Sequence, residues 1–174
     1  MKLNHFNLAR RMLQVHEGLR LKEYTDTTGH RTIGYGWNLD AKPLPQGIGK
    51  KDANGKWVIS EPEAQGLLDS SMIDHWNELT VAFPWVQSLN PWRKAVLLDM
   101  AFNMGIPVLK TFKNTLNSVL LQDYTDASRR MLQSKWAGQV KRRADVLSEI
   151  MRLGFMPAAI MNQYGFDFNK RGYE

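Results

Sequence analysis

The chain has 174 residues and no cysteine, which excludes a disulfide framework and any cysteine-based metal site. Hydrophobic residues make up 43% of it and charged residues 23%, a balance that excludes a disordered chain and is typical of a folded domain. A formal net charge of +6 favours polyanionic partners, or else serves solubility alone. The basic run at 141–143 is too short to predict a nucleic-acid site, so nucleic acid is not an expected partner.

The N-terminal part predicts a helix followed by a hairpin. Apolar residues recur at helical spacing over residues 4–17, and Gly18 is suited to end the helix. Strand-forming residues lie in 21–36 on both sides of the turn-forming segment 27–30, which predicts a small antiparallel hairpin. The segment 41–58 is rich in Pro, Gly and Asn-Gly turn signals, so we expect a third short strand or an irregular excursion there.

From residue 60 onward the predicted elements are helices. Ser60 and Glu63 form a capping box at the start of a long helix over 61–82. Asn90, followed by proline, is suited to begin another helix, which Gly105 closes. Three later segments also have a helical pattern: 114–122, 126–133 and 140–153.

These elements predict an α+β fold within one domain of residues 1–174. A small lobe of residues 1–60 carries the first helix and the hairpin. The helix over 61–82 connects it to a helical lobe of residues 83–174. A cleft between the two lobes is then the default place for a binding site.

Most chemical motifs are absent from the sequence. Its four histidines form no HExxH pattern, and neither a GxSxG motif nor a P-loop occurs. The two glycines of GYG at 34–36 lack the third glycine and the βαβ context of a dinucleotide site. We therefore expect no metal and no cofactor, and carboxylates remain as the candidates for catalysis.

Two carboxylates flank the predicted hairpin start. Glu17 ends a helix, where the helix dipole and apolar neighbours would raise its pKa, as a general acid requires. Asp26 lies at the edge of a solvated turn and should stay ionised. Such a divergent pair is typical of a glycosidase. The alternatives are a solvated glutamate at a helix end and an aspartate that only stabilises its turn.

The segment 17–36, with its runs EGLRLK, YTDTTG and TIGYG, resembles the catalytic block of the phage-type lysozymes, or endolysins. These enzymes are the muramidases of glycoside hydrolase family twenty-four. Similar segments follow at four places, so that the resemblance extends from residue 13 to residue 153: 58–64, 101–105, 112–116 and 136–144.

The resemblance implies roles for individual residues. Glu17 would be the general acid, Asp26 the second carboxylate, and Thr32 would help to position water or substrate. Arg143 would support Glu17, the alternative being a surface arginine on a basic helix. Six residues would line the sugar-binding cleft: Asn38, Leu39, Phe102, Asn103, Asn114 and Thr115.

The implied function is that of a monomeric, bacteriolytic endolysin of bacteriophage type. It would hydrolyse the β-1,4 bond between N-acetylmuramic acid and N-acetylglucosamine in bacterial peptidoglycan and so lyse the host cell. With no signal peptide and no membrane-spanning run visible, we expect synthesis in the host cytoplasm and holin-type release to periplasmic peptidoglycan. The alternatives are a lytic transglycosylase and an inactive peptidoglycan-binding module.

The sequence departs from the family pattern in three places. Trp37 stands where some members carry a smaller or titratable residue, and residues 41–50 have less helical character than expected. The tail at 154–174 has no counterpart in the pattern. Sequence leaves open the host, a free or virion-borne role, and an inverting or retaining outcome.

Overall fold

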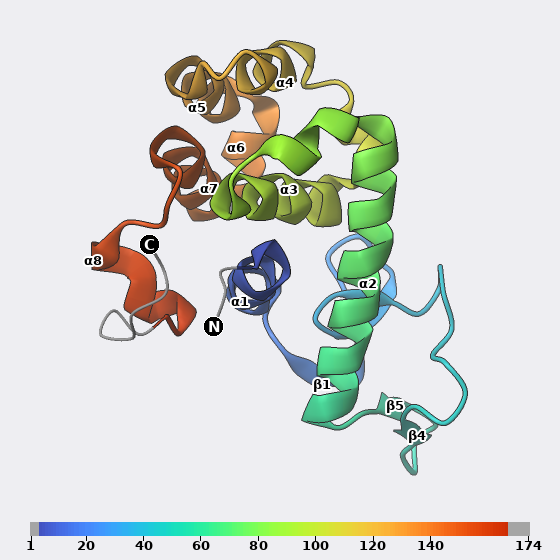
Figure 1. Ribbon diagram of the computed structural model, residues 1–174. Coiled ribbons are helices and arrows are strands. Elements are labelled where there is room, and N and C mark those ends of the chain that lie inside the picture. The colour runs from blue at the N-terminus through green and yellow to red at the C-terminus, as the bar shows by residue number, and fades with distance from the viewer. Residues whose placement is uncertain (1–3, 167–174) are drawn as a thin grey trace. The chain divides into compact units, whose positions relative to one another are not determined.

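The structure, a computed structural model, describes residues 4–166. It divides the chain into two compact units, one formed by residues 13–73 and one by residues up to 12 together with those from 74 onward. Two helices run from one unit into the other, α1 (His5–Glu17) and α2 (Glu61–Ala82) (Figure 1). Residues 4–12 thus belong with the later helices, whereas the sequence pattern groups them with the hairpin.

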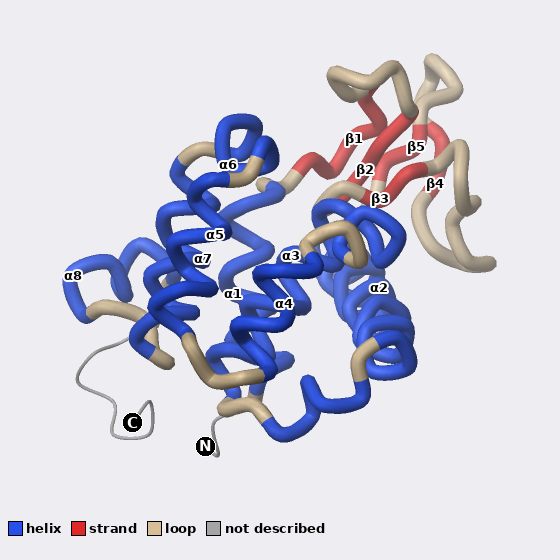
Figure 2. The backbone as a smooth tube through the Cα atoms, turned by 90° about the horizontal axis from the view of Figure 1, so that it is seen from above, coloured by secondary structure: helices blue, strands red, loops and turns tan. Residues whose placement is uncertain are grey.

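The unit of residues 13–73 contains an antiparallel sheet of five short strands in the order β3-β2-β1-β5-β4 (Figure 2). The predicted hairpin is formed by β1 and β2, in which Tyr24 lies opposite Thr32. A second hairpin, β4–β5, closes the turn-rich segment, which contains no helix. The strands are β1 (Arg20–Thr25), β2 (Arg31–Gly34), β3 (Trp37–Asn38), β4 (Lys50–Lys51) and β5 (Trp57–Val58).

The other unit is helical, which together with the sheet confirms the α+β prediction. Helix α7 packs against α3, α5 and α6, and α5 also packs against α4. The elements after α2 are η1 (Pro84–Ser88), α3 (Pro91–Leu109), α4 (Lys113–Leu120), α5 (Tyr124–Gln133), α6 (Lys135–Val140), α7 (Arg142–Leu153), α8 (Ala158–Met161) and η2 (Asn162–Tyr164). Among the described residues no single helix is long and apolar enough to cross a membrane. By length and composition alone, α3 and α4 pass that test as a pair bent by 120°.

Two helix starts form as the sequence predicts. The backbone N–H of Ser60 donates to Glu63 Oε2 at 2.7 Å, and the N–H of Glu63 donates to Ser60 Oγ at 3.3 Å, which is a reciprocal capping box. At α3 the N–H of Arg93 donates to Asn90 Oδ1 at 2.9 Å. Both signals act within four residues, so they can be read without tertiary information.

Two backbone breaks differ from the sequence pattern. Gly105, with φ of 77°, interrupts α3 instead of ending it, because the helix resumes to Leu109. The single helix predicted over 140–153 is wrong at its start. Lys141 has φ of 50°, a left-handed conformation unusual for a residue with a side chain, and it separates α6 from α7.

The described part of the C-terminal tail packs on the helical unit. Phe166 is 1% exposed, and its ring meets that of Trp92 edge to face at 5.4 Å between centroids. The Arg11 guanidinium lies 5.3 Å from the Phe166 ring centroid and donates to the carbonyl of Gly165. The tail therefore ties Arg11, in the middle of α1, to the later helices. Residues 167–174 lie outside the described part of the chain.

Candidate active site

Glu17 is the last residue of α1 and is half-buried. Gly18, with φ of +70°, ends the helix and turns the chain toward β1. The Glu17 carboxyl lies over Gly36, where a methyl group added to the Cα would stand 3.4 Å from Glu17 Oε2. Gly36 itself has φ of +82°. The glycine-rich run after β2 thus leaves room beside this carboxylate.

We expect Gly36→Ala to reduce both stability and activity. A side chain in the left-handed region costs about 1–2 kcal/mol, and the new methyl group would touch the Glu17 carboxyl, 3.4 Å from Oε2, and occupy the space beside it. Thermal melting and cleavage of peptidoglycan would measure the two effects. Gly29→Ala is the matched control, since Gly29 has φ of +88° but open space around its Cα. If the two variants lose equal activity, the contact with Glu17 is irrelevant.

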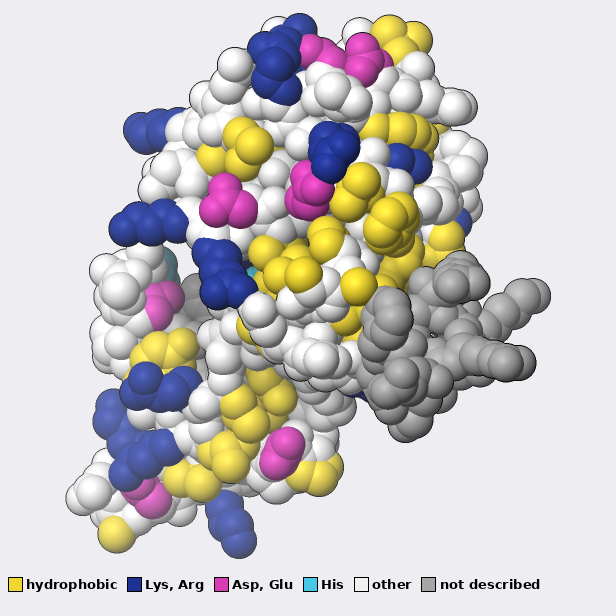
Figure 3. All heavy atoms as spheres, turned by 90° about the vertical axis from the view of Figure 1, so that its left-hand side faces the viewer, with side chains coloured by type: hydrophobic (Ala, Val, Ile, Leu, Met, Phe, Trp, Pro, Cys, Tyr) yellow, Lys and Arg dark blue, Asp and Glu magenta, His cyan; other side chains and the backbone are white. Residues whose placement is uncertain are grey.

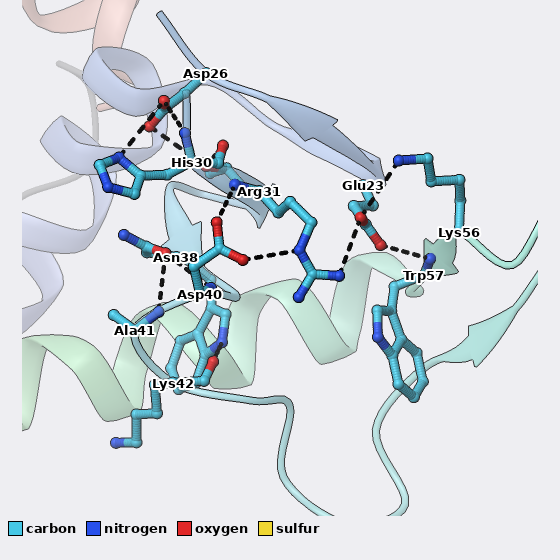
Figure 4. A network of polar contacts seen from close by, with 12 residues as sticks. Glu23, Asp26, His30, Arg31, Asn38, Asp40, Ala41, Lys42, Lys56 and Trp57 are labelled. Atoms are coloured by element: carbon cyan, nitrogen blue, oxygen red, sulfur yellow. Dashed lines mark hydrogen bonds and ion pairs between the residues drawn. The ribbon is translucent and has the colours of Figure 1, made fainter. Parts of the chain in front are cut away.

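Asp26 begins the turn between β1 and β2, and its Oδ1 holds that turn together (Figure 4). Oδ1 accepts the backbone N–H of His30 at 2.9 Å, the hydroxyl of Thr28 at 2.8 Å and the backbone N–H of Thr28 at 2.9 Å. These bonds, with that from His30 the strongest, lower the pKa of Asp26. Asp26 therefore stabilises its turn, which the non-catalytic alternative predicts, and it is also an ionised carboxylate.

Thr32 is brought against the other oxygen of Asp26. Its hydroxyl lies 3.5 Å from Asp26 Oδ2 and 3.1 Å from the carbonyl oxygen of His30, and the residue is 3% exposed. The hairpin register places Thr32 opposite Tyr24 on β1 and opposite Asn38 on β3. Two of the three predicted catalytic residues therefore meet across one turn.

A charged network that the sequence did not reveal supports this hairpin (Figure 4). Arg31 binds Asp40 twice, through its backbone N–H and its Nε, each at 2.8 Å. Its Nη1 also lies 3.5 Å from Glu23, whose side chain is 3% exposed. Glu23 accepts the backbone N–H of Trp57 at 3.1 Å and pairs with Lys56. This network links β1, β2 and β5 and holds the strand that carries Thr32.

The two cleft residues predicted in this unit lie on and just after β3. Asn38 Oδ1 accepts the backbone N–H groups of Asp40 and Ala41, at 2.9 and 3.1 Å, and so shapes the chain after the strand. Leu39 is buried. Trp37, the departure from the family pattern, is also buried and donates its indole N–H to the carbonyl of Lys42 at 2.9 Å. It anchors the segment that follows β3.

The other predicted site residues belong to the helical unit. The Phe102 ring lies 5.2 Å from that of His75, and Asn103 Oδ1 accepts the indole N–H of Trp136 at 2.8 Å. Asn114 and Thr115 line a pocket of about 570 Å³. Its lining also includes Trp136 and three basic residues: Lys113, Arg130 and Lys135.

Arg143 is buried and paired, so the alternative of a surface arginine is wrong. It is 9% exposed, and its Nε donates to Asp99 Oδ1 at 2.8 Å. Asp99 lies on α3 and is 0% exposed. The sequence pattern does not predict this partner. The one signal for it is a lone charge in an otherwise apolar stretch of α3.

The positive charge of the protein is unevenly divided. By sequence, residues 13–73 carry 7 Lys or Arg and 8 Asp or Glu, while the rest of the chain carries 16 and 9. On the face in Figure 3, basic side chains occur in separate groups with acidic side chains among them. This pattern differs from the continuous basic stripe typical of nucleic-acid binding.

Comparison with known proteins decides the family. A family model described as phage lysozyme matches residues 14–146, which include Glu17, Asp26, Thr32 and Arg143. The chain belongs to the phage lysozyme family. All three predicted catalytic residues of this phage lysozyme homologue lie in the unit of residues 13–73.

Curated relatives agree with this membership. The chain is 30% identical over 156 residues to the pre-baseplate central spike protein Gp5 of Enterobacteria phage T4, covering 82% of this chain but only 27% of the spike protein. It is 27% identical to probable T4-type lysozyme 1 of Dictyostelium discoideum, covering 84% of this chain and 95% of that protein. Probable T4-type lysozyme 2 of the same organism is 26% identical, with coverages of 82% and 92%.

Proposed function

We propose that this phage lysozyme homologue hydrolyses the β-1,4 bond between N-acetylmuramic acid and N-acetylglucosamine in bacterial peptidoglycan. The observation that carries the proposal is the folded block from Glu17 to Gly36. It combines a half-buried carboxyl at a helix end with an ionised carboxylate whose second oxygen adjoins a threonine hydroxyl. Family membership supports a peptidoglycan-cleaving, lysozyme-like activity.

Glu17 is the general acid in this proposal. Cleavage of a glycosidic bond requires a proton on the departing oxygen, and a carboxyl group at a partly desolvated position can supply it. The open space that Gly36 leaves beside Glu17 allows a sugar oxygen to approach. A larger residue at position 36 would occupy that approach.

Asp26 acts as the charged partner. Because hydrogen bonds lower its pKa, it carries its negative charge throughout the neutral and mildly acidic range. That charge stabilises the oxocarbenium-like transition state and orients water for attack at the sugar carbon. The hydroxyl of Thr32, close to Asp26 Oδ2, gives the same water a second polar partner.

The helical unit supplies binding in this proposal. Asn114 and Thr115 line a pocket with three basic residues, and the excess of positive charge lies in this unit. Peptidoglycan carries carboxylates on its peptides, so a basic pocket beside polar side chains is complementary to it.

Mass spectrometry of digested peptidoglycan tests the reaction. We expect fragments with reducing N-acetylmuramic acid ends, because Asp26 and Thr32 can orient a water molecule. Fragments ending in 1,6-anhydro-N-acetylmuramic acid would instead identify a lytic transglycosylase. Intact glycan strands with retained binding would identify an inactive wall-binding module. Reducing N-acetylglucosamine ends would show that the other β-1,4 bond is cut.

A further inference from the structure

The two oxygens of Asp26 have unequal surroundings. Oδ1 receives three hydrogen bonds of 2.8–2.9 Å from the turn, two of them from Thr28. Among the described residues, Oδ2 has one hydrogen-bonding neighbour, the Thr32 hydroxyl at 3.5 Å. A carboxylate oxygen can accept about two or three such bonds, so Oδ1 is saturated and Oδ2 retains capacity.

The hydrogen bonds around the Thr28 hydroxyl have a defined donor and acceptor at each step. The Thr28 hydroxyl lies 2.8 Å from Asp26 Oδ1 and 2.7 Å from Nδ1 of His30. It has a single proton, and an ionised carboxylate is a stronger acceptor than a neutral imidazole nitrogen. Thr28 therefore donates to Asp26, and His30 donates its Nδ1–H to the Thr28 oxygen. The result is a directed chain from His30 through Thr28 to Asp26.

We propose that Thr28 and His30 are positioning residues that orient the Asp26 carboxylate, so that Oδ2 is the oxygen that serves the reaction. The terminal torsion of an aspartate is intrinsically broad. The Thr28 hydroxyl, held by His30, narrows this torsion and keeps the second oxygen directed toward Thr32. This inference rests on the proposed function, because it assigns Asp26 a part in cleavage.

The chain of contacts has an additional feature that suits positioning. Both Thr28 and His30 are exposed, so their bonds contribute little to the packing of the hairpin. The hairpin is already held by the Arg31, Asp40 and Glu23 network and by the two backbone N–H bonds to Asp26 Oδ1. Loss of the Thr28 hydroxyl should consequently change the orientation of the Asp26 carboxylate more than the stability of the hairpin.

Thr28→Val removes the hydroxyl and keeps the shape of the side chain. With solubilised glycan strands as substrate, we expect kcat to fall about three- to tenfold, the value of one such hydrogen bond. KM and the melting temperature should stay unchanged. Thr28→Ser should restore kcat, since serine supplies the same hydroxyl. Thr27→Val is the matched control, because Thr27 is an exposed neighbour in the same turn.

A second pair of variants tests the role of His30. In His30→Asn the amide NH2 group can still donate a hydrogen bond to the Thr28 oxygen, so kcat should stay near the wild-type value. His30→Phe has no donor and should behave like Thr28→Val. Unchanged kcat in both Thr28→Val and His30→Phe would overturn the proposal. So would a change in KM alone, or a failure of serine to restore activity. Cleavage by the wild-type protein is measured alongside. A wild-type protein that releases no reducing ends would refute the proposed function itself, whereas unchanged kcat in these variants would refute only the positioning role.

Discussion

Replacing Glu17 with glutamine is expected to lower the rate of peptidoglycan cleavage by about 10²–10⁴-fold, the usual contribution of a general acid. The amide is nearly the same size as the carboxyl group and fits beside Gly36, but it has no acidic proton to give to the leaving oxygen. Turbidity loss of cell walls and release of reducing ends would both measure the decrease. The melting temperature should remain close to that of the wild type.

Glu61→Gln is the matched control for this experiment. Glu61 is an exposed carboxylate in the first turn of α2 and belongs to the same unit as Glu17. Its loss should leave cleavage unchanged. A folded Glu17→Gln variant that retains a tenth of wild-type turnover would remove Glu17 from the role of acid. Another carboxyl group of the chain would then have to donate the proton.

Arg143→Ala is expected to destabilise the protein by about 3–5 kcal/mol, the cost of leaving one charge of a buried pair without its partner. Asp99 is 0% exposed, so its carboxylate cannot turn to solvent after the guanidinium is removed. For a chain of this size, that cost corresponds to a decrease in Tm of about 6–20 °C. Thermal and urea unfolding would measure it.

A double variant distinguishes the effect of losing the Arg143–Asp99 ion pair from the effect of losing the packing of the arginine side chain. Asp99→Asn combined with Arg143→Ala should be more stable than Arg143→Ala alone, since it removes the buried negative charge that no longer faces the guanidinium group. Arg142→Ala is the matched control, because Arg142 is an exposed neighbour, and it should cost less than about 1 kcal/mol. A loss below about 1 kcal/mol in Arg143→Ala would contradict the importance of the pair. A shifted basic limb in its pH–activity profile would support the assistance to Glu17 that the family resemblance implies.

Short-range signals made much of this fold predictable. The capping box of Ser60 and Glu63, the Asn90 cap and the Thr-Thr-Gly turn each involve residues within four positions of one another. Their energetics are settled by local backbone geometry, so α2, α3 and the β1–β2 hairpin appear where the pattern predicts them. Two backbone breaks are exceptions: α3 continues past Gly105 to Leu109, and a left-handed lysine between two helices, Lys141, has no local sequence signal.

The sequence by itself determined the α+β class, the family block at 17–36 and the identities of its two carboxylates. It could not reveal which charges are buried together. Arg143 and Asp99 are 44 positions apart, and Glu23 meets Trp57 across 34. The burial of such charges depends on side chains contributed by distant helices and strands. The hydrophobic periodicity of a segment does not predict these partners. For the same reason only the tertiary structure showed that one oxygen of Asp26 is committed to the turn while the other faces Thr32.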